Sequence, residues 1–366
     1  MNCFELRACR RSSRRRVFLR STPRFSGTRW FGIGWLRVAA LVLSVWIIAG
    51  VFAPAHAGGI RIKFATLAPE GSNWMKVLRV LDKELRAKTG GEVSFKFYPG
   101  GISGDEKDVI RKMRIGQVHA AGFTGVGLGQ ILPEVRVLDL PFLFEKDQEV
   151  EFVYRKMADY FAARFEEKGY VLLGWVPVGW IHFFSRREIR GLDDLRQTKA
   201  WMWEGDPLVE EAYRVIKVTP YPLSITDVLM SLQTGLIETV YSSPLGALAL
   251  QWFSKVKYMS RVRMGYGTGG VLMSKKKFDA LSAEQQAVLR DLSRDFLRTL
   301  VRETRRDNEK SMQVILKSGV ALSQAPSPEE LREFHRAGAV IRENLTGKLF
   351  SQSLLNTVLS HLAEAR

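Results

Sequence analysis

The sequence predicts an α/β fold with two domains. The chain has 366 residues, of which 46% are hydrophobic and 25% charged, as expected for a globular protein of about two domains. From residue 60 onward, segments with apolar residues at every second position alternate with segments in which they recur at helical spacing. This βαβαβ order predicts a parallel sheet covered by helices.

The elements follow one another along the chain. Ile60, Ile62 and Phe64 alternate with polar residues and predict a strand over 60–66. We expect further strands at 93–97, 117–123, 170–178, 199–203, 237–242 and 267–274. We expect helices at 72–88, 105–115, 148–168, 206–216, 225–234, 244–254 and 282–317, and one more beginning at 327. Ser282 and Ser327 each precede Gln or Glu by three residues, which is the pattern of a capping box.

Residues 1–57 have the composition of an export signal. They hold ten Arg, no Lys and one acidic residue, so +9 of the net charge of +17 lies there and +8 remains for the rest of the chain. An apolar run of 16 residues, 38–53, precedes Ala55-His56-Ala57, which is typical of a signal peptide cleaved after Ala57. A retained anchor is the alternative, but a membrane span needs about 20 apolar residues. We therefore expect a periplasmic protein that binds no nucleic acid.

The mature chain carries no recognisable motif for catalysis. Both cysteines, Cys3 and Cys9, lie in the leader, so the mature form can hold no disulfide and no cysteine–metal site. The glycines of 125–129 (GVGLG) are followed by Gln130, where the dinucleotide-binding fingerprint requires its third glycine. We expect a protein that is not an enzyme and that uses no cofactor and no metal.

Several segments resemble, in order, the extracytoplasmic solute receptors of TRAP (tripartite ATP-independent periplasmic) transporters, the DctP-like family. Residues 104–118 resemble the family's G-x-E helix and the strand that follows it. Residues 138–144 (LDLPFLF) resemble its D-x-P-F-L-F signature, and 191–195 (GLDDL) match its D-L segment. Residues 231–238 (SLQTGLIE) are similar to its A-L-Q-T-G-x-x-D, and Lys257-Tyr258 match its K-Y.

The resemblance implies a two-lobed periplasmic-binding-protein-like fold with crossing hinge strands and a long helix that spans both lobes. The implied divisions are lobe I at 58–178 and about 267–306, lobe II at about 179–266 and about 307–340, and a C-terminal helical tail at 341–366. Such a receptor captures a small organic ligand, either an organic acid or an apolar or aromatic compound, by closing its lobes. It then delivers the ligand to membrane-integral TRAP subunits.

Two other functions remain as alternatives. An exported enzyme or a ligand sensor could be built on the same two-lobed scaffold. The sequence also leaves open a homodimer or an extra periplasmic partner protein.

The ligand site is expected where strands end and helices begin. The candidate ligand-binding residues are Leu67, Phe123, Thr124, Trp180, Trp201, Trp203 and Ser243. Alignment on Lys199 puts Trp201 at the position of the family's carboxylate-binding arginine. Ser243-Pro244 replaces the family's Asn-Pro, and 179–184 contain no arginine where relatives often have one. These departures predict a pocket that is more aromatic and less selective for anions.

Two local features complete the analysis. The apolar helical period stops at Gly235, which predicts a helix end with positive φ at this glycine. Asp206 precedes Pro207, a pair typical of a helix start, so we expect Asp206 to cap the next helix rather than bind an ammonium group.

Overall fold

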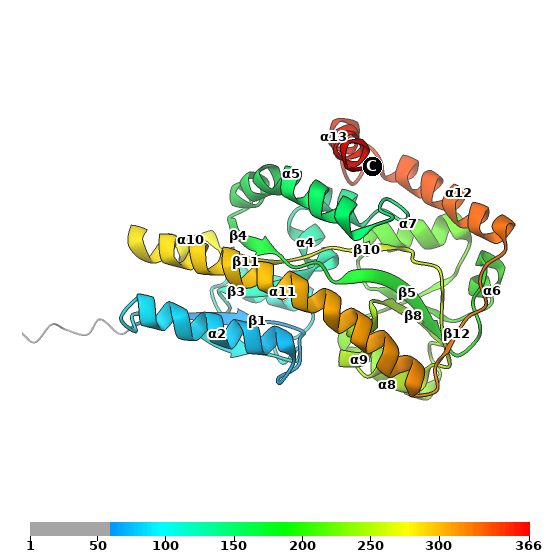
Figure 1. Cartoon of the computed structure of the whole chain (residues 1–366), viewed down its shortest axis with the longest axis horizontal. Helices are drawn as coiled ribbons and strands as arrows, with labels where there is room; N and C mark the ends of the chain where they lie inside the picture. The colour runs from blue at the N-terminus through cyan, green and yellow to red at the C-terminus, as the bar shows by residue number, and fades with distance from the viewer. Residues whose placement is uncertain (1–58) are drawn as a thin grey trace, which may run out of the picture. The chain divides into compact units, whose positions relative to one another are not determined.

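A computed structural model describes residues 59–366, which form a two-lobed α/β fold (Figure 1). The predicted signal peptide, 1–57, and its cleavage site lie outside the described residues. Each lobe is built around one β-sheet. We call the lobe with the first sheet lobe I and the lobe with the second sheet lobe II.

The sheet of lobe I has the strand order β2-β1-β3-β11-β4. Its strands are β1 (Ile60–Ala65), β2 (Val93–Tyr98), β3 (Ala120–Thr124), β4 (Tyr170–Trp175) and β11 (Gly269–Ser274). β1 is parallel to β2 and β3, as the order of elements predicts. β11 is antiparallel to β3 and β4, so the complete sheet is mixed. The reason is that β11 enters this sheet only after the chain has passed through lobe II.

Helices cover both faces of this sheet. They are α2 (Asn73–Lys88), α3 (Glu106–Arg114), α4 (Gly125–Ile131), the 3₁₀ helix η1 (Pro133–Asp139) and α5 (Asp147–Glu167). α2 buries Met75, Leu78, Leu81 and Leu85, the stripe expected from their helical spacing. The glycine-rich segment 125–129 forms α4, directly after the C-terminal end of β3.

The sheet of lobe II has the order β12-β9-β5-β8-β6-β7, and β10 pairs with β5. Its strands are β5 (Gly179–Ser185), β6 (Ala200–Trp203), β7 (Pro220–Leu223), β8 (Thr239–Ser242), β9 (Tyr258–Met259), β10 (Gly265–Gly267) and β12 (Ala321–Leu322). The helices between these strands are α6 (Leu192–Arg196), α7 (Pro207–Ile216), η2 (Ile225–Asp227), α8 (Val228–Thr234), α9 (Pro244–Ala249) and η3 (Trp252–Lys255).

The chain crosses between the two sheets twice in extended conformation. The first crossing runs from the end of β4 to the start of β5 at Gly179, whose φ of 112° is unfavourable for residues with a side chain. The second crossing lies at Thr268, between β10 and β11. The strand predicted at 267–274 is therefore divided, with one part in each sheet. We propose that these crossings mark the lobe boundaries predicted near 178 and 267.

A helix of 35 residues, α11 (Ala283–Lys317), spans the two lobes. It follows the short α10 (Lys275–Phe278) and packs against α2 of lobe I and α9 of lobe II. Figure 1 shows α11 in yellow to orange, running from α2 toward α9. The two crossings and this helix are the connections that a hinge movement would have to bend.

The C-terminal segment forms two more helices. α12 (Pro328–Leu345) packs against α7, and α13 (Gln352–Ala365) packs against α5. The helical tail was expected to begin at 341, but α12 continues through that position. The apolar face of α13 adds Leu354, Leu355, Val358 and Leu362 to the core of lobe I.

The predicted helix caps are confirmed. Gly235 ends α8 in the left-handed conformation, with a φ of 76°. Ser282 and Ser327 each form a capping box at the start of α11 and α12. The Asp206 carboxylate accepts a hydrogen bond from the Leu208 backbone N–H at 3.0 Å and begins α7.

Candidate functional site

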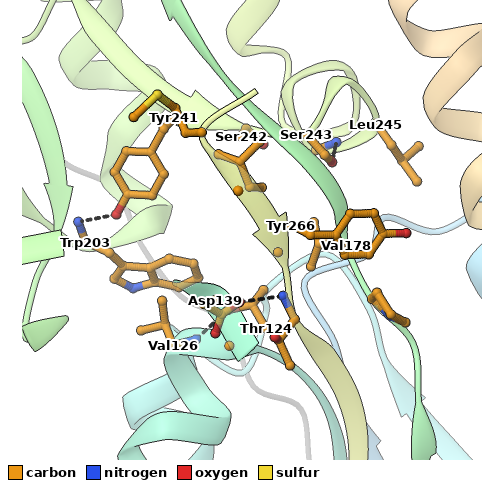
Figure 2. Close-up of a pocket in the computed structure, with 18 of the residues that line it drawn as sticks. Thr124, Val126, Asp139, Val178, Trp203, Tyr241, Ser242, Ser243, Leu245 and Tyr266 are labelled. Atoms are coloured by element: carbon orange, nitrogen blue, oxygen red, sulfur yellow. Dashed lines mark hydrogen bonds between the residues drawn. The ribbon is translucent and has the colours of Figure 1, made fainter. Parts of the chain in front are cut away.

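A cavity of about 630 Å³ lies between the two lobes. Its wall includes residues that follow β1 and β3 of lobe I and residues at the ends of β6 and β8 of lobe II. The crossings contribute Val178 and Thr268, and α11 contributes Thr304. Figure 2 shows Thr124, Asp139, Trp203, Tyr241 and Tyr266 around this space. The cavity has the size and position of a site for a small organic molecule.

Aromatic side chains make up one wall of the cavity. The Trp201 ring stacks on Tyr241, with 4.8 Å between ring centroids and 22° between ring planes. Trp203 and Trp252 also contact Trp201, at centroid distances of 5.9 and 5.2 Å. The Tyr241 hydroxyl accepts a hydrogen bond from the Trp203 backbone N–H at 3.1 Å (Figure 2). This wall belongs to the core of lobe II and is held rigidly by its own packing.

Asp105 connects the two lobes at one edge of the cavity. It lies directly before α3 in lobe I and is only 2% exposed. From lobe II, the Trp203 indole N–H donates to its carboxylate at 3.1 Å, the Ser224 hydroxyl at 2.6 Å and the Ile225 backbone N–H at 3.1 Å. Three donors satisfy this buried carboxylate and bind one lobe to the other.

Arg136 makes a second connection between the lobes. Its guanidinium Nη2 donates to both carboxylate oxygens of Asp206 in lobe II, at 2.9 and 3.0 Å. Its Nη1 donates to Oδ2 of Asp139 in lobe I at 3.0 Å. Arg136 and Asp206 are 5% and 2% exposed, so this ion pair is shielded from solvent. Burial raises the pKa of Asp139, although the neighbouring guanidinium acts in the opposite direction.

Another buried acid, Glu106, lies beneath the start of α4. Its carboxylate accepts from the Thr124 backbone N–H at 2.7 Å, the Thr124 hydroxyl at 2.9 Å and the Gly127 backbone N–H at 2.7 Å. Burial raises the pKa of Glu106 to about 7, against the effect of these hydrogen bonds. A side chain at Gly127 would collide with this carboxylate, which explains why a glycine lies here in a helix. The glycine-rich segment thus allows α4 to pack closely against the Glu106 carboxylate.

The start of α9 is satisfied by side chains of the protein. The Ser243 hydroxyl accepts a hydrogen bond from the Gly246 N–H at 3.2 Å and caps the helix. The Leu245 N–H donates to the amide oxygen of Asn308 at 3.0 Å, and the Asn308 amide nitrogen donates to the carbonyl of Val178 at 2.9 Å. Asn308 therefore joins α11, α9 and the first crossing.

Most of the residues predicted for the site contribute to this cavity. Those in its wall are Leu67, Phe123, Thr124, Trp201, Trp203 and Ser243. Trp180 is not among the lining residues. Its indole N–H donates to Asp147 at 3.0 Å, its ring edge meets Tyr266, and the Arg263 guanidinium lies 4.7 Å from its ring centroid. Trp180 packs instead on the core around α5, and we leave it out of the proposed site.

Three buried charges of the cavity were not predicted from the sequence, namely Glu106, Arg136 and Asp139. A signal for two of them was present. Arg136 and Asp139 stand three residues apart within an otherwise apolar stretch, 135–144, where a charge must be paired if it is buried. Lys199, two residues before Trp201, is exposed and donates to the carbonyl of Gly235, and the cavity wall does not include it.

Among residues 59–366, no three His, Cys, Asp or Glu side chains are grouped so that they could hold a metal ion. Within the same residues, no helix combines the length and apolar character needed to cross a membrane.

The sequence pattern of one protein family, DctP, described as "Bacterial extracellular solute-binding protein, family 7", matches residues 64–346. The chain belongs to this family. The resemblance drawn from the motifs is thereby confirmed, and so is the two-lobed fold class. The family is one of solute-binding proteins, which supports a binding function and gives no support to the enzyme alternative.

Individual relatives are distant. A solute-binding protein of Verminephrobacter eiseniae is 27% identical over 58% of this chain and 64% of its own length. The ectoine/5-hydroxyectoine-binding periplasmic protein of Ruegeria pomeroyi is 25% identical over 57% of this chain and 62% of its own. The matched regions thus span somewhat less than two thirds of these two relatives.

A solved structure has the same fold. The sugar acid binding protein of Advenella mimigardefordensis, in complex with galactonate, superposes with a TM-score of 0.79. It is 20% identical and covers 84% of this chain and 99% of its own. At this identity the comparison establishes the fold, while the ligand of the present chain has to be argued from its own residues.

Proposed function

We propose that this protein is the extracytoplasmic receptor of a TRAP transporter and that it captures a small organic solute between its two lobes. The observation that carries the proposal is the cavity of about 630 Å³ whose wall comes from both lobes and both crossings. A solute in that position contacts both lobes at once, so its binding energy favours the closed arrangement over an open one. Family membership supports the same function.

The proposed binding residues are Leu67, Phe123, Thr124, Trp201, Trp203 and Ser243. In the aromatic wall, the partly exposed Tyr241 ring packs on the buried Trp201 ring and supplies a flat apolar surface for a planar or cyclic part of the solute. Burial of apolar surface contributes roughly 25 cal/mol per Å², and indole rings add stacking energy. The hydroxyl groups of Ser242 and Tyr241, which also line the cavity, can position polar groups of the solute.

The proposed function requires that this receptor lies outside the cytoplasmic membrane, where it meets the solute. The apolar run and Ala55-His56-Ala57 support export to the periplasm by a cleaved signal peptide. The closed receptor would then deliver its solute to membrane-integral TRAP subunits. Light scattering on the purified protein tests for a homodimer, and affinity purification from a periplasmic extract tests for an additional partner protein.

A thermal-shift screen tests the proposed function. A ligand that binds the native state raises the melting temperature, and the increase grows with the ligand concentration. The screen covers organic acids, neutral aromatic compounds and cyclic zwitterions. At least one class should stabilise the protein without being chemically converted. Conversion of the stabilising compound by the pure protein would support the enzyme alternative instead.

A further inference from the structure

The guanidinium of Arg136 already has anionic partners. Both of its terminal nitrogens donate to carboxylates, Nη2 to Asp206 and Nη1 to Asp139. Arg136 is the single buried cation in the cavity wall within residues 59–366. The other cation of the wall, Lys310, is solvent-exposed, where attraction to a ligand is screened. Nε of this guanidinium has no partner among the described residues, but both terminal nitrogens are paired with carboxylates of the protein.

Two helix starts that meet the cavity, those of α4 and α9, are occupied in the same way. At α4, the N–H groups of Thr124 and Gly127 donate to Glu106, and that of Val126 donates to the Thr124 hydroxyl. At α9, those of Leu245 and Gly246 donate to Asn308 and Ser243. Helix N-termini are the backbone groups that usually receive an anion. At α4 and α9 the protein has satisfied them with its own oxygens.

We propose that Asp206 occupies the place of a ligand anion at Arg136, so that this receptor selects uncharged or cationic solutes and rejects free carboxylates. The inference rests on the proposed function, because it names the solute class of the same cavity. The proposal also assigns a role to Arg136. By pairing with Asp206 across the lobe boundary, this arginine stabilises the closed arrangement of the lobes without a charged group from the solute.

The physical reason is the cost of displacing a buried ion pair. A carboxylate that bound Arg136 would leave Asp206 buried without its cation, or would add a third anion beside Asp139 and Asp206. An uncompensated buried charge is strongly unfavourable. A neutral amide, hydroxyl or aromatic group requires no such displacement, and a cation would be attracted by Glu106, Asp139 and Asp206.

Asp206→Asn tests the proposal cleanly. Asparagine caps a helix as well as aspartate does, so α7 keeps its start, while the charge opposite Arg136 is removed. The probes are benzoate, benzamide and benzamidine, which share one shape and differ in charge. Glu204→Gln is the matched control, because Glu204 pairs with Lys107 across the same lobe boundary but is exposed and lies outside the cavity wall.

Calorimetry should show that the wild type binds benzamide or benzamidine at least tenfold more tightly than benzoate. Asp206→Asn should raise the affinity for benzoate relative to benzamide at least tenfold, and Glu204→Gln should leave this ratio unchanged. A wild type that binds benzoate as tightly as benzamide overturns the proposal. So does an unchanged ratio in Asp206→Asn, including the case in which that variant binds no probe. A different result would contradict the proposed receptor function itself: the wild type would then bind no solute of any class in the thermal-shift screen.

Discussion

Arg136 of lobe I and Asp206 of lobe II form a buried ion pair across the boundary between the lobes, with Nη2 2.9 Å from Oδ2. Two segments 70 residues apart in the sequence meet here. Together with the hydrogen bonds that Asp105 accepts from Trp203, Ser224 and Ile225, this pair fixes the relative position of the lobes beside the cavity.

Removal of the guanidinium should be costly. Arg136→Met leaves the Asp206 and Asp139 carboxylates without their cation, and breaking a buried pair in this way costs about 3–5 kcal/mol. Urea unfolding measures the loss. The control is Lys107→Met, which removes an exposed inter-lobe pair with Glu204 and should cost less than about 1 kcal/mol. Equal losses in the two variants would contradict the assignment of Arg136 as the main electrostatic link.

Glu106 should make stability decrease as the pH rises. Burial raises the pKa of this carboxyl to about 7 in the folded state, from 4.5 as the reference for the unfolded chain. The folded state therefore binds more protons between these values, and the free energy of unfolding falls across this window by up to roughly 3 kcal/mol. Glu106→Gln should flatten this slope.

The measurement is a set of urea unfolding curves from pH 4.5 to pH 7.5. His182 makes the free energy of unfolding rise with pH, because burial lowers its pKa to about 4. The free energy of unfolding of Glu106→Gln is therefore subtracted from that of the wild type at each pH, which removes the contribution of His182. Glu309→Gln, at an exposed position of α11, is the control and should leave the slope as it is. A difference curve that is flat with pH would show that Glu106 does not titrate in this range.

Trp201 should contribute to both stability and binding. Its ring is 1% exposed, and its indole N–H donates to the Leu223 carbonyl at 3.0 Å. Trp201→Ala should cost about 3–5 kcal/mol through the cavity it creates. Trp201→Phe should cost about 1 kcal/mol and also weaken binding of an aromatic solute. Trp180→Phe is the control for binding, since Trp180 lies outside the cavity wall, and equal weakening by both variants would contradict the proposed site.

Gly235 should be required for its backbone conformation. At a φ of 76° a β-branched residue is strained, so Gly235→Val should lower the free energy of unfolding by at least about 1–2 kcal/mol. Gly235→Asn should cost less, because asparagine tolerates the left-handed region. Thermal and urea unfolding of the two variants provide the comparison. If Gly235→Val and Gly235→Asn have the same free energy of unfolding, the turn can change its backbone conformation and the prediction is contradicted.

The sequence predicts what depends on local patterns. Helices, strands and caps follow from the spacing of apolar residues and from Ser, Asp and Gly at helix ends, which is why Asp206 and Gly235 lie where expected. The sequence did not separate Gly267, which belongs to β10, from 269–274, which form β11, because these residues read as one extended run. The point at which the chain crosses from one lobe to the other depends on which strands pair in each sheet, and local sequence patterns do not show this pairing.

The charges of the cavity depend on contacts that are distant in the sequence. Asp206 was predicted as a helix cap, and it is one, but its second partner Arg136 approaches from the other lobe. Likewise, Trp201 was expected to face the ligand at the position of an arginine. The structure adds that it stacks on Tyr241 within the core of lobe II, which no spacing in the sequence indicates.

Small-angle X-ray scattering with a compound from the thermal-shift screen tests the central claim most directly. The protein should become more compact when the solute is added, because the solute bridges the lobes. Leu245→Trp, which narrows the cavity, should abolish the compaction, whereas Leu236→Trp, at an exposed position outside the cavity wall, should retain it. A radius of gyration that stays constant under saturating solute, or compaction that survives in Leu245→Trp, would contradict solute capture between the lobes.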